Sequence, residues 1–115
     1  MQEWYERIST GSQAKFRTRM LYLASTPQHK WEAPPRYPYA KRVGDKIWEI
    51  RFLYGRIQHR PLGFFGPEQG VFTFVLGARE QNGRFVPRNA LAIAVNRKHQ
   101  IQEDGERAHE CTIFG

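Results

Sequence analysis

The clearest alternation of hydrophobic and polar positions lies near the middle of the chain, over residues 47–54. One side of this segment is apolar or aromatic, with Trp48, Ile50, Phe52 and Tyr54, and the other is mixed, with Ile47, Glu49, Arg51 and Leu53. Side chains of a β-strand repeat every two residues. The pattern therefore predicts a strand with one buried face and one partly polar face.

Two further strands are expected directly after the first. Gly55 suits a tight reversal, and residues 56–65 then place three polar side chains on one side, Arg56, Gln58 and Arg60. Pro61 has no N–H for the ladder, which predicts a bulge or an outward-facing position. Residues 66–70 hold two glycines and a proline, as in a hairpin loop. Residues 71–78 are nearly all apolar, so we expect them to form the central strand.

Helical spacing precedes these strands. Residues 2–9 indicate a short helix, and Thr10-Gly11-Ser12-Gln13 fits a capping box that opens a second helix. The second helix has an apolar stripe at helical intervals, made of Phe16, Met20, Leu23 and Ala24. Thr26-Pro27 ends this helix, because the residue before a proline avoids the α region. From there to Gly44 the chain is predicted to be irregular.

A third helix is expected near the C-terminus. Residues 80–86 are predicted to form a polar loop, and Pro87 to open the helix at a position where its missing N–H costs little. The apolar edge of the helix consists of Ala90, Leu91, Ala94 and Val95. Gly105 is expected to end it, and the last ten residues to form a frayed tail.

Together these elements predict an α+β fold, with two N-terminal helices packed on a three- or four-stranded antiparallel sheet and a C-terminal helix closing it. A length of 115 residues fits a single domain, residues 1–115. Hydrophobic residues make up 40% of the chain, so we expect it to fold rather than stay disordered. No apolar run approaches the ~20 residues that a membrane span needs, and we expect no membrane association.

The charge balance narrows the class of partner. The chain has 18 Lys and Arg residues against 11 Asp and Glu residues, a net charge of +7. A basic surface concentrates phosphates or acidic partners near it, and a basic domain without such a partner is the plain alternative. Residues 1–6 lack the basic and apolar segments of a signal peptide, and the single Cys111 cannot close an internal disulfide. We therefore expect a cytoplasmic protein.

The order of helices, strands and sequence motifs along the chain resembles that of a known protein family. Two helices precede the run Gly-Asp-Lys-Ile-Trp-Glu-Ile-Arg at residues 44–51, and a hairpin with Arg60, an apolar strand, a polar loop and Pro87 follow. In this order the chain resembles the RelE superfamily of bacterial toxins, and within it the phage-derived HigB-like branch. The resemblance covers residues 10–100, and residues 44–51 are its most specific part. It implies a toxin of a toxin–antitoxin pair, which cuts mRNA on the ribosome without metal or cofactor and is restrained by an antitoxin, commonly a helix-turn-helix protein.

The implied reaction is attack of a ribose 2′-OH on the adjacent phosphate, which needs a base, an acid and cations for the pentacovalent charge. The resemblance assigns Arg60 to the scissile phosphate and Arg79 to the leaving group, with Arg51 as a further strand arginine. A guanidinium suits a phosphate because its planar fork donates two bonds at once. This hypothesis needs Arg60 and Arg79 to converge at one open surface. The structural alternative is that Arg51 pairs with Glu49 and that the other two arginines also serve the fold.

His59 is the titratable candidate for acid or base work, because the unperturbed pKa of histidine is ~6.5. Strand alternation places it opposite Arg60, under the helices, where a packed histidine is the alternative. The other candidates for RNA contact are three cations and one ring, Lys46, Arg56, Arg84 and Phe85. No metal-ligand spacing links the scattered histidines and Cys111.

Two alternatives to the nuclease remain open. RelE proteins carry lysines where this chain has Ile47 and Glu49, so a lysine base on that strand is missing. One alternative is an RNA- or ribosome-binding domain on the same fold that does not cut. The other is a phage-derived protein-interaction domain whose basic surface binds an acidic partner.

Overall fold

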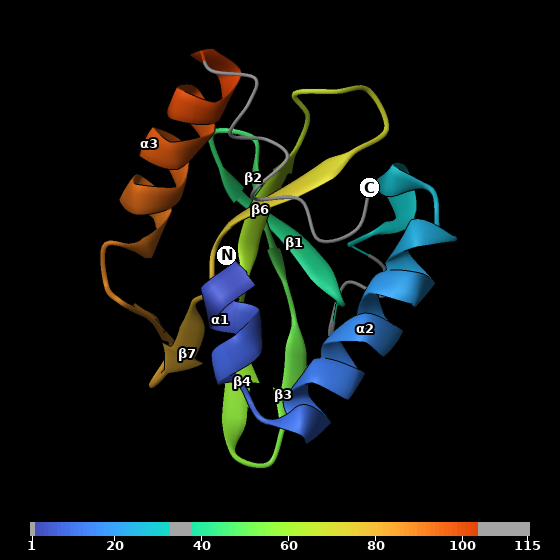
Figure 1. The fold of residues 1–115 in the computed structure, drawn as a ribbon, viewed down its shortest axis with the longest axis vertical. Helices are drawn as coiled ribbons and strands as arrows, with labels where there is room; N and C mark the ends of the chain where they lie inside the picture. Colours follow the sequence, from blue (N-terminus) through green and yellow to red (C-terminus); the bar gives the residue numbers. More distant parts are fainter. Residues whose placement is uncertain (1, 33–37, 104–115) are drawn as a thin grey trace.

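Three α-helices and eight short strands make up the part of the chain that the computed structural model describes, residues 2–32 and 38–103 (Figure 1). The helices are α1 (Gln2–Arg7), α2 (Thr10–Ala24) and α3 (Ala90–Glu103), with a 3-10 turn, η1 (Gln28–Lys30). The strands are β1 (Ala40–Gly44), β2 (Ile47–Ile50), β3 (Phe52–Tyr54), β4 (Ile57–His59), β5 (Leu62–Phe65), β6 (Phe72–Leu76), β7 (Arg79–Gln81) and β8 (Arg84–Val86). The α+β class is confirmed.

The strands form two four-stranded antiparallel sheets, and the prediction of a single sheet with three or four strands is wrong. Their orders are β1-β2-β5-β6 and β3-β4-β7-β8. Three segments run from one sheet into the other, through Arg51, through Arg60-Pro61 and through Gly77-Ala78. Pro61 accounts for the second crossing, because it has no N–H for the ladder. The bulge expected beside it is present as a register shift between Leu62 and Gly63.

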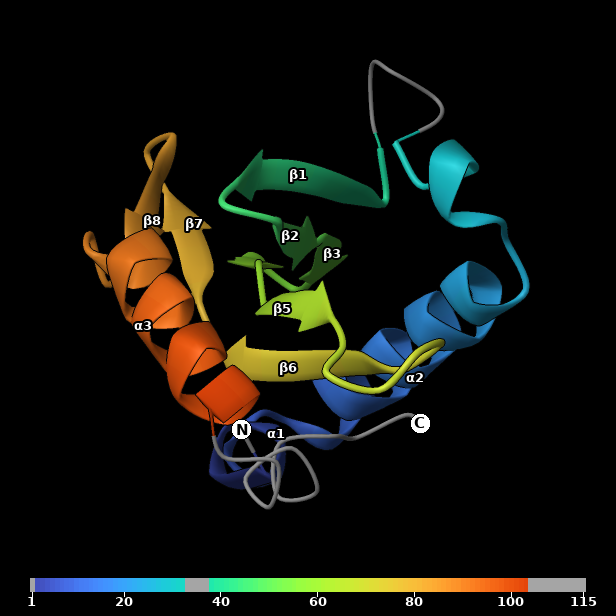
Figure 2. The same ribbon diagram turned by 90° about the horizontal axis from the view of Figure 1, so that it is seen from above.

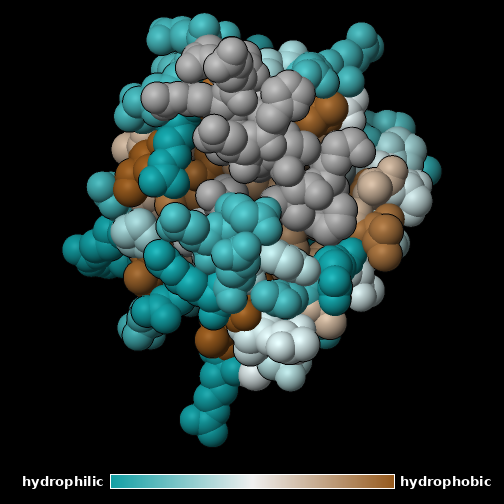
Figure 3. Space-filling model, in the orientation of Figure 1, coloured by the Kyte–Doolittle hydropathy of each residue, from teal (hydrophilic) through white to brown (hydrophobic). Residues whose placement is uncertain are grey.

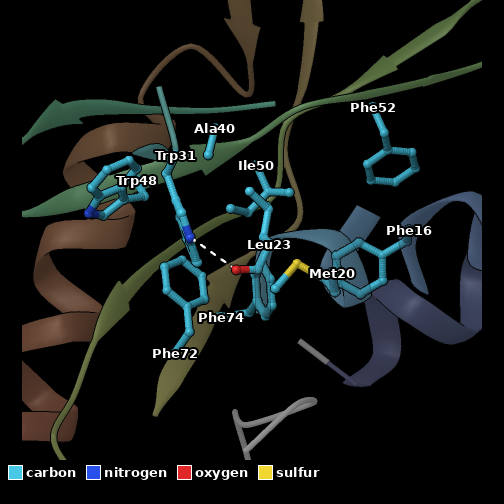
Figure 4. Packing of buried hydrophobic residues seen from close by; sticks show 10 residues of the cluster. All are labelled: Phe16, Met20, Leu23, Trp31, Ala40, Trp48, Ile50, Phe52, Phe72 and Phe74. Atoms are coloured by element: carbon cyan, nitrogen blue, oxygen red, sulfur yellow. Dashed lines mark hydrogen bonds between the residues drawn. The ribbon is translucent and has the colours of Figure 1, made fainter. Parts of the chain in front are cut away.

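Helices cover both faces of the first sheet. Seen from above, α2 and α3 lie on opposite sides of the stacked strands β1, β2, β5 and β6 (Figure 2). Between α2 and the strands lies the first cluster of buried side chains, Phe16, Met20, Leu23, Trp31, Ala40, Trp48, Ile50, Phe52, Phe72 and Phe74 (Figure 4). Trp31 donates from Nε1 to the Leu23 carbonyl over 3.1 Å, so this loop ring packs on its own domain.

The second cluster lies between α3 and the opposite face. It consists of Ile47, Leu62, Phe64, Val75, Ala78, Ala90, Ala94 and Ile101. The alternation in residues 47–54 thus separates Trp48 from Ile47 as predicted, and α3 buries the second side as well. Two basic residues of α3 bond to backbone carbonyls: the exposed Arg97 donates from Nη1 to Val75 over 2.7 Å, and the buried Lys98 donates from Nζ to Asp45.

Several expectations about the strands are wrong. Residues 71–78 were expected at the centre of the sheet, but among the described strands β6 lies at the end of its order. Residues 40–44, expected to be irregular, form β1. The predicted polar loop at 80–86 is the β7–β8 hairpin, which turns at Asn82 and Gly83 with φ values of 55° and 76°. Asn-Gly favours this turn because both central residues need a positive φ.

The helix starts also differ from those predicted. Ser9, not Thr10, caps α2, because its Oγ accepts a hydrogen bond from Ser12 N over 3.1 Å. Helix α3 begins at Ala90, whose N–H donates to the Pro87 carbonyl over 3.1 Å, so Pro87 lies in the turn before the helix. Gly105 and the expected tail fall outside the described residues.

The surface is predominantly hydrophilic on the face that Figure 3 shows, and its apolar residues form separate small patches. None of the described helices combines the length and the apolar character that crossing a membrane would require.

Candidate functional site

The predicted catalytic residues are divided between two faces of the second sheet. His59 and Arg79 are direct partners in the antiparallel pair of β4 and β7, so their side chains share one face. Arg60 follows His59 immediately, and its side chain lies on the other face, against Glu49 and Glu80. Arg60 and Arg79 therefore do not converge, and that prediction is wrong. The reason is the pleat, since neighbouring residues of a strand point to opposite faces.

Arg60 belongs to a carboxylate–guanidinium cluster, which we define as Glu49, Arg51, Arg60 and Glu80. Glu49 Oε2 lies 3.2 Å from Arg60 Nε and 3.3 Å from Arg51 Nε. Arg60 Nη2 lies 3.8 Å from Glu80 Oε1 and donates to Gln58 Oε1 over 2.8 Å. The alternative in which Arg51 pairs with Glu49 is thus observed, and Arg60 is ion-paired too.

The cluster is buried at one end and open at the other. The side chain of Arg60 is 7% exposed, whereas those of Arg51 and Glu80 are 28% and 30% exposed. Arg60 Nε is buried without a hydrogen-bond partner among the described residues, because its contact with Glu49 has the distance of an ion pair but not the alignment of a hydrogen bond. Leaving such a donor unmet costs about 1–3 kcal/mol. The cluster thus reaches solvent through Arg51 and Glu80, while Arg60 and Glu49 form its buried end.

Burial sets the protonation of the central carboxyl. Desolvation raises the pKa of Glu49 above its ordinary value, and Arg51 and Arg60 only partly offset this rise. The pKa of Arg60 is lowered by burial and by Arg51, yet a guanidinium stays charged at neutral pH. The cluster therefore presents a proton acceptor with a pKa shifted toward neutrality beside fixed positive charges.

His59 occupies a separate environment on the other face. Its side chain is 5% exposed, stacks on Phe52 with ring centroids 4.6 Å apart, and has Nε2 3.2 Å from Ser12 Oγ. Burial lowers its pKa, and the positive charges of Arg60 and Arg79 lower it further. His59 is thus the packed histidine of the alternative interpretation, and it also lines a cleft with Arg79 and Ser12.

The lowered pKa of His59 makes a prediction about stability. The unfolded chain takes up a proton near pH ~6.5, whereas the folded chain resists protonation until a lower pH. The contribution of His59 is therefore complete above pH ~6.5 and is lost as the pH falls. We expect the free energy of unfolding, measured by urea titration, to fall more between pH 7.5 and pH 5.5 for the wild type than for His59→Gln. Parallel curves would contradict this; Glu49, whose shift has the opposite sign, is common to both proteins.

The remaining candidates for RNA contact do not form one group. Lys46 lies in the β1–β2 turn with φ 62°, and Arg56 follows Gly55 in the β3–β4 turn, so they occupy opposite ends of residues 47–54 (Figure 1). Phe85 is the register partner of Glu80 and shares the face of the cluster. Arg84 is exposed and partners Gln81, on the face of Arg79.

No protein-family model, curated protein or solved structure matches the chain. Across residues 2–32 and 38–103, no group of three or more His, Cys, Asp and Glu side chains is placed to hold a metal ion.

Three residues of the two faces were not predicted as site residues. Glu49 and Glu80 complete the cluster, and Ser12 contacts His59. Glu49 had a local signal, since it lies two positions from Arg51 on the same side of a strand. Ser12 had no local signal in the sequence, because 47 residues separate it from His59.

Proposed function

We propose that this protein is an endoribonuclease of the toxin type, which cuts ribosome-bound mRNA through its carboxylate–guanidinium cluster. The observation that carries the proposal is the Glu49 carboxylate, held 3.2 Å and 3.3 Å from guanidinium nitrogens of Arg60 and Arg51. A base next to two cations is the chemical set that attack by a 2′-OH on its neighbouring phosphate requires. The roles first assigned to His59 and Arg79 pass to Glu49 and Arg51.

Each residue of the cluster has a defined task in this mechanism. Glu49 accepts the proton of the 2′-OH as the 2′-oxygen bonds to phosphorus, and its raised pKa suits that task at neutral pH. Arg51 and Arg60 stabilise the charge on the phosphorane through their guanidinium groups, both of which already lie beside the Glu49 carboxylate. The bond from phosphorus to the 5′-oxygen then breaks, and water supplies the proton to that oxygen. The products are a 2′,3′-cyclic phosphate and a 5′-hydroxyl.

The phosphate has to displace one contact within the cluster. The pair of Arg51 and Glu49 is the weaker obstacle, because Arg51 is 28% exposed and partly exposed ion pairs contribute only about 0–1 kcal/mol. Arg60 stays in place, fixed by Gln58 and by the His59 carbonyl. Arg51 is therefore the residue that turns toward the substrate, and Phe85 on the same face is placed to stack on a base.

The substrate, the partner and the compartment of this proposal come from the resemblance. They are mRNA on the ribosome, an antitoxin of the helix-turn-helix type and the cytoplasm. The net charge of +7 supports an RNA substrate, because cationic surfaces attract the phosphate backbone without sequence preference.

Glu49→Gln tests the proposed base. We expect it to slow cutting of a defined message on purified ribosomes by about 10²–10⁴-fold, the usual contribution of a general base. Cuts are mapped by primer extension, and 5′-hydroxyl ends are verified by kinase labelling without prior dephosphorylation. The matched control is Glu32→Gln, which removes the same charge from an exposed pair with Arg42 and is expected to cut at the wild-type rate.

Circular dichroism and thermal melting of both variants test whether they are folded, and cutting rates are compared only at temperatures where both are. Wild-type protein that sediments with ribosomes but leaves the message intact would reject the nuclease in favour of the RNA-binding alternative. Cutting by Glu49→Gln at the wild-type rate would reject Glu49 as the base.

A further inference from the structure

A cleft on the opposite face of the second sheet is unused by the proposed reaction. It has a volume of about 350 Å³ and lies where α1 and the start of α2 meet β4, β7 and β8. Its lining includes two cations, two buried polar groups and an aromatic ring, from Arg7, Arg79, Ser12, His59 and Trp4. We name it the His59 cleft. Pockets for small ligands start at about this size.

We infer that the His59 cleft binds a nucleoside monophosphate. The inference does not depend on the nuclease proposal, because the cleft and the carboxylate–guanidinium cluster lie on opposite faces of the sheet. Three properties of the cleft support it: the placement of its positive charges, its preformed aromatic wall and the polar groups of its floor.

The cations at the cleft are free to bind an anion. Among the described residues Arg79 forms no ion pair, and its side chain is exposed on the face of His59. Arg7 lies 3.4 Å from Glu3, but both side chains are about four-fifths exposed, at 79% and 83%. Such a pair contributes little and exchanges readily with solvent. Two guanidinium groups beside a cavity suit a phosphate dianion, which each can bind through two bonds.

The aromatic wall is held in place by the protein. Trp4 packs edge-on against Phe16, with ring centroids 5.4 Å apart and planes at 89°. A Cβ atom at position 77 would lie 2.0 Å from the Trp4 ring, so the ring rests directly on the backbone of Gly77. Ile57 adds an apolar surface that is 43% exposed. This combination favours a ligand that has a flat ring as well as a charge.

The floor of the cleft supplies directional polar groups. Ser12 is 2% exposed and His59 is 5% exposed, and the two side chains are joined by a 3.2 Å contact. Ser12 Oγ also accepts from Ser9 Oγ over 3.0 Å, so Ser9, Ser12 and His59 form a continuous chain of polar contacts. Few, convergent polar groups in a largely apolar pocket are how small-molecule sites select their ligand. A nucleotide offers sugar hydroxyls and base edges to such groups.

The test uses the purified full chain and the four ribonucleoside 5′-monophosphates, titrated by isothermal calorimetry and by tryptophan fluorescence. At least one nucleotide should bind ten-fold or more tightly than its nucleoside and than inorganic phosphate. Arg79→Ala should weaken this binding at least ten-fold, whereas Arg17→Ala, which removes an exposed charge from α2, should leave it unchanged. Glu49→Gln should bind as the wild type does, so that loss of cutting and loss of binding are separable.

Four results would overturn the inference. They are the absence of binding for all four nucleotides, equal binding of inorganic phosphate, equal losses in Arg79→Ala and Arg17→Ala, and loss of binding in a Glu49→Gln variant that a thermal melt shows to be folded. Equal binding of phosphate would show a simple anion site, and equal losses would show a general effect of charge. Because Arg79 is exposed, its replacement is not expected to unfold the protein, and a thermal melt of the variant verifies this.

Discussion

Replacing Arg60 by alanine is expected to destabilise the fold by up to about 3–5 kcal/mol, because its removal leaves the buried Glu49 carboxylate with only the partly exposed Arg51 as a cationic partner. Glu49 is only 8% exposed, and Arg60 is its buried partner at 3.2 Å. The loss should also depend on pH. Glu49 already has a raised pKa, so its charged form costs stability, and that cost appears as the pH rises through the pKa of the folded state. Urea unfolding should therefore show a larger loss at pH 8 than at pH 5.

Arg42→Ala is the matched control for Arg60→Ala. Arg42 also contacts a glutamate, with Nε 3.0 Å from Glu32, but its side chain is 69% exposed. Its removal should cost about 0–1 kcal/mol, as for other surface ion pairs. A loss below about 1 kcal/mol in Arg60→Ala would show that solvent already screens the cluster. The same argument applies to Glu49→Gln, which removes the nearest carboxylate from the buried Arg60, so activity lost in either variant reports chemistry only where a thermal melt shows that the variant is folded.

The fold was predictable where the signal is local. The alternation of residues 47–54 identified Trp48, Ile50 and Phe52 as one buried face, because the pleat of a strand depends only on neighbouring residues. Pro61 indicated a bulge for an equally local reason, and a register shift follows it. The Asn82-Gly83 turn is also a local signal, and the β7–β8 hairpin at residues 79–86 could have been predicted from it.

The prediction of the site was wrong where it depended on contacts between distant parts of the chain. Whether Arg60 and Arg79 share a face is decided by the register of β4 against β7, and a slip of one residue moves a side chain to the other face. That register depends in turn on where the chain crosses between the sheets, at Gly77-Ala78. No sequence pattern predicts this crossing. The position of β6 at the end of its sheet also depends on contacts between distant parts of the chain. Strand β6 is apolar on both faces because helices cover both sides of its sheet. A strand with two apolar faces is usually taken for a central strand, which is why its position at the end of the sheet was missed.

Phe16→Ala is expected to cost about 3–5 kcal/mol, since truncating a fully buried phenylalanine loses its transfer free energy and leaves a cavity. Phe16 is 0% exposed and joins parts of the chain that are far apart in sequence. Its ring centroid lies 5.4 Å from that of Trp4 on α1, 5.6 Å from that of Phe52 on β3 and 5.2 Å from that of Phe74 on β6. The loss is a large share of the ~5–15 kcal/mol that stabilises a typical domain, and urea unfolding followed by circular dichroism measures it.

Leu21→Ala on the same helix is the control for Phe16→Ala, because Leu21 is 67% exposed and its replacement should change stability by no more than about 0.5 kcal/mol.

Phe16→Ala also tests whether the two faces of the second sheet act independently. Trp4 packs on Phe16, so a cavity there should loosen α1 and weaken nucleotide binding in the His59 cleft, while the carboxylate–guanidinium cluster keeps its contacts. A folded Phe16→Ala variant should therefore still cut ribosome-bound message. Equal loss of cutting and nucleotide binding in that variant would mean that the two faces are coupled through the core.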